Sequence, residues 1–208
     1  MNNLITQAIH KSISYTDYRN IVQDLLVEGK STGNQQSEEL TKYSELNEVR
    51  MNRLDKTIFV TEEVENALNQ LQGEYTWLVI TEGWCGDAAQ ILPVLNKMAS
   101  LSSNITMKIV LRDEHDELMN QFLTNGSKAI PKLIVIKNAT QDVLAHWGPR
   151  PEGATQLIRD YKETHGIIDE TAKTNLQKWY LQDRGLSIMN EVVHLMKEVE
   201  TKITTEAV

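Results

Sequence analysis

Hydrophobic positions recur at helical spacing in two segments near the start of the chain. We expect the first segment to be capped by Thr16 and to end at Gly29. The second begins near Ser37 and carries charged side chains on its opposite face. The apolar residues that carry the spacing are Tyr18, Ile21, Val22, Leu25 and Leu26 in the first segment and Leu40, Tyr43, Leu46 and Leu54 in the second. Residues 1–56 are therefore predicted to form a helical N-terminal extension.

The middle of the chain alternates between strand-like and helix-like patterns. A short helix between Thr61 and Gly73 precedes the apolar run Thr76 to Thr81, which is typical of a buried strand. Further strands are predicted over residues 105–111, 132–136 and 143–147, and further helices over residues 88–100 (kinked at Pro93), 114–123 and 152–164. From the first strand onward the order is β-α-β-α-β-β-α.

This order predicts the directions of the strands. A helical crossover joins the first two strands, which we expect to be parallel, and a short turn joins the last two, which we expect to be antiparallel. The sequence therefore predicts an α/β fold over residues 57–166, with a mixed sheet flanked by helices.

Two more amphipathic segments follow residue 166. Their apolar positions are Ala172, Leu176, Trp179 and Tyr180, and then, after Gly185, Leu186, Met189, Val192, Val193 and Met196. We expect residues 167–208 to form a helical C-terminal extension that packs on the core.

Composition and charge narrow the classes of function. The chain has 208 residues, of which 40% are hydrophobic, so it can bury a core without disulfides. Its formal net charge of -8 argues against nucleic-acid binding. Residues 1–11 lack the basic and apolar regions of a leader, and no stretch approaches the roughly 18 apolar residues of a membrane span. We expect a cytoplasmic protein without a membrane partner.

The only cysteine, Cys85, lies where the run Thr76 to Thr81 gives way to the helix predicted from Ala88. A thiol at the start of a helix suits nucleophilic or redox chemistry, because unpaired N–H groups and the helix dipole favour the thiolate. Between Trp84 and Gly86, we expect this thiol to be partly accessible and reactive.

The turn Trp84-Cys85-Gly86 resembles the active-site turn of the thioredoxin superfamily, which usually reads Trp-Cys-Gly-Pro-Cys. Pro93 follows the cysteine by eight residues, where thioredoxins place a helix-kinking proline, and Gly148 matches a family glycine after the final strand. The resemblance covers about residues 57–166 and implies a thioredoxin-like fold with helical extensions at both ends.

Ile130-Pro131 matches the isoleucine and cis-proline of the same family. The resemblance implies that this pair lies beside Cys85 and shapes a substrate groove. There the backbone of Ile130 would pair with an extended peptide, as an added strand pairs with a sheet edge.

Three departures from the family pattern change the expected activity. Ala88 stands in place of the second, resolving cysteine, so no internal disulfide can form. Asp87 replaces the proline of the turn, and its carboxylate disfavours a thiolate nearby. Val79 replaces the family's buried acid. We therefore predict monothiol exchange, in which the nucleophile Cys85 forms mixed disulfides with protein disulfides or small thiols and an external thiol performs the release.

Neither a metal nor a cofactor is expected. The histidines follow no His-x-x-x-His spacing and are scattered over the chain at positions 10, 115, 146, 165 and 194. Glu82 and Asp87 surround Cys85 in sequence, whereas a glutathione-using enzyme needs cations to hold the carboxylates of its substrate. This charge pattern argues against a glutaredoxin-like activity.

Two alternatives to exchange chemistry remain open from the sequence. One is a non-catalytic protein-binding module that keeps the fold and the groove, uses its helical additions to hold a partner and leaves Cys85 incidental. The other is a redox sensor, in which Cys85 links two copies into a disulfide-bonded homodimer.

Overall fold

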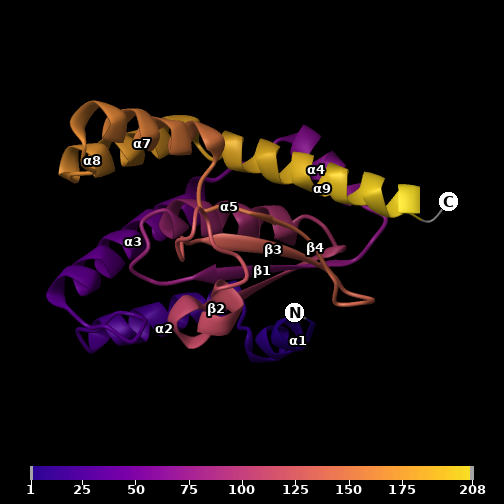
Figure 1. Ribbon diagram of the computed structural model, residues 1–208, viewed down its shortest axis with the longest axis horizontal. Helices are drawn as coiled ribbons and strands as arrows, with labels where there is room; N and C mark the ends of the chain where they lie inside the picture. Colours follow the sequence, from indigo (N-terminus) through magenta and orange to yellow (C-terminus); the bar gives the residue numbers. More distant parts are fainter. Residues whose placement is uncertain (1, 207–208) are drawn as a thin grey trace.

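The computed structural model describes residues 2–206 and contains a mixed sheet with the strand order β2-β1-β3-β4 (Figure 1). The strands are β1 (Tyr75–Thr81), β2 (Ile105–Leu111), β3 (Lys132–Lys137) and β4 (Val143–Trp147). β1 runs parallel to β2 and antiparallel to β3, and β3 runs antiparallel to β4. The predicted strand directions are confirmed, because the crossover between β1 and β2 and the tight turn after β3 allow no others.

Helices cover both faces of the sheet. α5 and α9 pack against each other on one face, with α5 over β2 and α9 over β4, whereas α1 and α2 contact β2 from the opposite side (Figure 1). The helices are α1 (Asn2–Lys11), α2 (Tyr15–Val27), α3 (Glu38–Thr57), α4 (Glu62–Asn69), α5 (Ala88–Ser100), α6 (Asp116–Met119), α7 (Glu152–His165), α8 (Glu170–Asp183) and α9 (Leu186–Glu206). This arrangement confirms the predicted α/β class with helical additions at both ends.

The core is continuous from the sheet into the terminal helices. Every residue of β1 is buried, as its unbroken apolar run predicts for a central strand covered on both faces. Residues of α9 belong to the same apolar cluster, among them Ile188, Met189 and Val192, each with 0% exposure. The C-terminal helices are therefore part of the packed structure.

Three details of the predicted elements were wrong or missing. Helix α1 was not predicted, although its residues Ile5 and Ala8 are buried. α2 is capped by Ser14 and begins at Tyr15, because the side chains of Ser14 and Asp17 cap each other's backbone N–H groups in a capping box, and Thr16 lies inside the helix. The helix expected over 114–123 is only a 3₁₀ turn (Arg112–Glu114) and the short α6, since the backbone of His115 is not helical.

Candidate functional site

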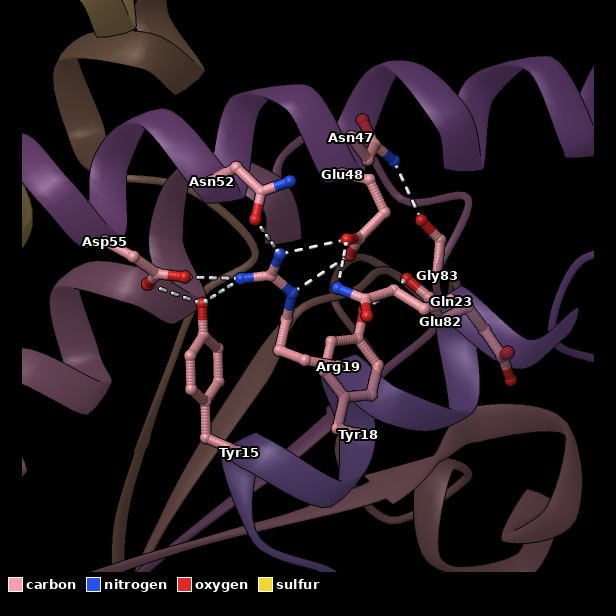
Figure 2. A network of polar contacts seen from close by, with 10 residues as sticks. All are labelled: Tyr15, Tyr18, Arg19, Gln23, Asn47, Glu48, Asn52, Asp55, Glu82 and Gly83. Atoms are coloured by element: carbon pink, nitrogen blue, oxygen red, sulfur yellow. Dashed lines mark hydrogen bonds and ion pairs between the residues drawn. The ribbon is translucent and has the colours of Figure 1, made fainter. Parts of the chain in front are cut away.

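The turn after β1 is held by the N-terminal helices. The hydroxyl of Tyr18 donates to the carbonyl of Glu82 at 3.4 Å, and the amide of Asn47 donates to the carbonyl of Gly83 at 2.9 Å (Figure 2). The N–H of Gly83 donates to Oγ1 of Thr32 at 2.7 Å. The backbone that leads into Cys85 is thus fixed by α2, α3 and the loop between them, all outside residues 57–166.

Cys85 lies beside the cis-proline, as the resemblance implied. The Ile130-Pro131 bond is cis, and Sγ of Cys85 donates to the carbonyl of Ile130 at 3.3 Å. A side chain at Gly148 would place its Cβ 2.5 Å from the carbonyl oxygen of Pro131, so this position requires glycine. The carbonyl of Ile130, which we expected to meet a peptide, is occupied by the thiol.

The predicted accessibility of the thiol was wrong, since Cys85 is only 7% exposed. Burial and, second, the negative charge of Asp87 raise the pKa of the Cys85 thiol to about 12. The pKa is lowered by the backbone N–H groups of Ala88 and Asp87 and by the charge of Arg150, but these effects are smaller than the increase from burial and Asp87. Cys85 is therefore a neutral thiol at physiological pH.

Asp87 ties the turn to the C-terminal helices. It occupies the N-cap position of α5 but makes no capping bond to that helix. Its carboxylate instead pairs with Arg150, through Nε at 2.8 Å and Nη2 at 2.7 Å, and accepts from the hydroxyl of Tyr180 at 2.9 Å. Ala88, in place of a resolving cysteine, is fully buried. This substituted turn is thus locked by residues of the loop before α7 and of α8.

A cavity of about 770 Å³ lies over the turn and reaches from α3 to α8. Of the residues proposed from sequence, Trp84, Cys85, Gly86, Asp87 and Ile130 line it, whereas Ala88 and Pro131 are buried behind them. The extensions supply a large part of the wall, with Leu40, Tyr43, Leu46 and Arg50 from α3 and Glu170, Lys173, Thr174, Leu176 and Gln177 from α8. A volume of this size suits a small molecule.

The charge around Cys85 is the opposite of what its sequence neighbours indicated. The cations that line the cavity are Arg50, Arg112, Lys128, Arg150 and Lys173, against the carboxylates of Asp87 and Glu170. Glu82 is not part of the lining, because its buried carboxylate accepts from the backbone N–H of Asp113 at 2.9 Å. Arg112 lies over the ring of Trp84, with Cζ 4.8 Å from the ring centroid. No sequence motif joins these cations, because they come from separate elements.

Among residues 2–206, no group of three His, Cys, Asp or Glu side chains is placed to hold a metal ion. Within the same residues, none of the helices combines the length and the apolar character needed to span a bilayer.

Alkylation of Cys85 tests the state of the thiol. We expect the alkylation rate of the folded protein to rise with pH without a plateau below about pH 12. In the unfolded chain the rate should level off above the pKa of a free cysteine, which is roughly 8.5. Asp87→Asn is expected to label faster, because it removes a negative charge that raises the pKa. Mass spectrometry of the adduct measures both rates, and a plateau near pH 7 in the folded protein would contradict this assignment.

Comparison with known proteins bears on the fold and the family. A family model described as thioredoxin matches residues 33–162, more than half of the chain. A structure of a protein of unknown function from Pseudomonas aeruginosa aligns with a TM-score of 0.57 and 15% identity, covering 89% of this chain and 98% of that one. A structure titled as an HIV epitope scaffold aligns with a TM-score of 0.56 and 18% identity, covering 89% and 99%. No curated protein matches.

Proposed function

The chain belongs to the thioredoxin family, and we propose that it is a binding module of that family, which holds a small molecule in the cavity over Cys85 and does not turn over disulfides. The state of the thiol carries the proposal. Cys85 is 7% exposed, it donates to the carbonyl of Ile130, and its pKa is raised to about 12. Since the thiolate is the attacking species in disulfide exchange, this thiol is a poor nucleophile at neutral pH.

The departures from the family pattern support the same proposal. Ala88 provides no resolving thiol, and Val79 provides no buried acid for proton transfer. Asp87 is bound to Arg150 and Tyr180, so the residue beside the thiol serves a structural ion pair. The helices α3 and α8 outside the central α/β region add residues that line the cavity, as expected of a site that binds a ligand.

Monothiol exchange is the second candidate, and one observation favours it. Cys85 lines the cavity, so a small disulfide held there would lie within reach of Sγ. The Cys85 thiolate would attack one sulfur, form a mixed disulfide and release the other sulfur as a thiolate; an external thiol would then free Cys85. Redox sensing through a homodimer is less favoured, because a buried sulfur in a cavity cannot meet its counterpart in a second copy without an opening of the structure.

Turnover of a small disulfide separates the two candidates. With glutathione as external thiol, we expect the wild type to reduce an aromatic disulfide no faster than Cys85→Ser, because the buried Cys85 thiol is protonated and does not attack the disulfide. Absorbance of the released thiol measures the rate. Turnover that depends on Cys85 would overturn the binding proposal in favour of monothiol exchange.

A further inference from the structure

One cation in the cavity has no carboxylate partner. Arg150 pairs with Asp87, Arg112 with Asp113, Lys128 with Asp116 and Lys173 with Glu170. Arg50 has no carboxylate within 4.0 Å among residues 2–206; it donates from Nη1 to Oδ1 of Asn47 at 2.9 Å. Asn47 is itself bound to the carbonyl of Gly83, so the guanidinium is held in place beside the turn. Its remaining N–H groups have no acceptor in the described part of the chain.

A second free donor lies next to Arg50. Oε1 of Gln177 accepts from Nε2 of Gln90 at 2.7 Å, which orients the amide of Gln177 and leaves its Nε2 without a partner in residues 2–206. The position that a Cβ atom on Gly86 would occupy lies 3.6 Å from Nη1 of Arg50 and 3.7 Å from Nε2 of Gln177. The missing side chain of Gly86 therefore leaves a space that two fixed donors face.

From this arrangement we infer that the cavity binds a small organic anion, with a carboxylate over Gly86 between Arg50 and Gln177 and an apolar body against Leu40, Leu46 and Leu176. The inference rests on the proposed binding function and names the class of ligand. A guanidinium binds a carboxylate through parallel hydrogen bonds, and Gln177 adds a neutral donor. The leucines come from α3 and α8, so both extensions contribute to recognition of the apolar body.

The electrostatics of Arg50 agree with this assignment. Burial lowers the pKa of Arg50; the charge of Asp87 raises it, and that of Arg53 lowers it further. The guanidinium is thus desolvated without a bonded counter-charge. An anionic ligand would supply that charge. The chain has a net charge of -8, yet the lining of this cavity is predominantly cationic, which favours entry of anions over cations.

Three probes of equal chain length test the inference on the full chain. Octanoate, heptyl phosphate and octanamide share a seven-carbon alkyl chain and differ in the head group. By titration calorimetry at pH 7, we expect octanoate to bind roughly tenfold or more tightly than octanamide, because only the carboxylate pairs with the guanidinium. Stronger binding of heptyl phosphate than of octanoate would overturn the carboxylate assignment, and so would equal binding of octanoate and octanamide or binding of none of the three.

Variants locate the carboxylate. Arg50→Gln is expected to weaken octanoate roughly ten- to a hundredfold and to leave octanamide unchanged, and Arg50→Lys to restore part of the loss. Lys56→Gln is the matched control, since it removes one positive charge from an exposed position of the same helix that does not line the cavity. Equal losses in Arg50→Gln and Lys56→Gln would overturn the inference. A negative result in these binding experiments would not contradict the proposal of a non-catalytic binding module, because disulfide turnover at Cys85 tests that proposal separately.

Discussion

Replacing Arg19 by methionine is expected to lower the free energy of unfolding by about 3–5 kcal/mol, because it leaves the buried carboxylate of Glu48 without its counter-charge. The guanidinium donates to both carboxylate oxygens of Glu48 at 2.9 and 3.0 Å and to the side chain of Asn52 at 2.8 Å, and it pairs with Asp55 (Figure 2). The side chains of Arg19 and Glu48 are 8% and 9% exposed. This network joins α2 to α3.

Chemical denaturation of the variant measures the loss in the free energy of unfolding. The midpoint temperature of thermal unfolding should fall by about 2–4 °C per kcal/mol for a chain of this size. Arg53→Met is the control, because Arg53 is an exposed cation on α3 and its replacement should cost about 0.5 kcal/mol or less. The double variant Arg19→Met, Glu48→Leu should recover part of the stability, since it removes the stranded carboxylate as well. A single variant as stable as the control would show that the network contributes nothing.

The network also bears on the cavity. α3 carries Asn47, which holds Gly83, and Arg50, which faces the space over Gly86. Loosening α3 from α2 would therefore disturb both the turn and the proposed carboxylate site. We therefore expect Arg19→Met to weaken ligand binding as well as stability, although Arg19 does not line the cavity.

Asp87→Ala is expected to cost about 3 kcal/mol of stability, at the lower end of the range for a broken buried pair, because the side chain of Arg150 is 29% exposed. The substitution leaves the guanidinium of Arg150 and the hydroxyl of Tyr180 without their shared acceptor. It also removes the negative charge that raises the pKa of Cys85, so alkylation should become faster. Denaturant titration and labelling kinetics measure the two effects separately.

Tyr180→Phe is the matched comparison for this variant. It removes one hydrogen bond to Asp87 and leaves the ion pair intact, so its cost should be about 1 kcal/mol. If both substitutions cost the same, the pair with Arg150 adds nothing to the stability of the turn. If Asp87→Ala is as stable as the wild type, the interactions of Asp87 with Arg150 and Tyr180 do not stabilise the turn.

The sequence by itself determined most of the local elements and the relative directions of two strand pairs. Alternation and apolar runs predicted the four strands, and connection lengths predicted that β1 and β2 are parallel and that β3 and β4 are antiparallel. The strand order β2-β1-β3-β4 came from the tertiary structure. The resemblance of Trp84-Cys85-Gly86 and Ile130-Pro131 to thioredoxin motifs implied that the cis-proline lies beside Cys85, and the structure places it there. Helix α1 was not predicted, although its buried residues Ile5 and Ala8 follow helical spacing.

Only the tertiary structure decided the chemistry of that turn. Whether Cys85 is exposed depends on what packs over it, and the covering residues come from α3 and α8, far away in the chain. The charge around the thiol was misjudged for the same reason, since Arg50 and Arg150 reach it through space while the neighbouring Glu82 points elsewhere. Electrostatic environment follows distance in three dimensions and burial, neither of which a local pattern contains.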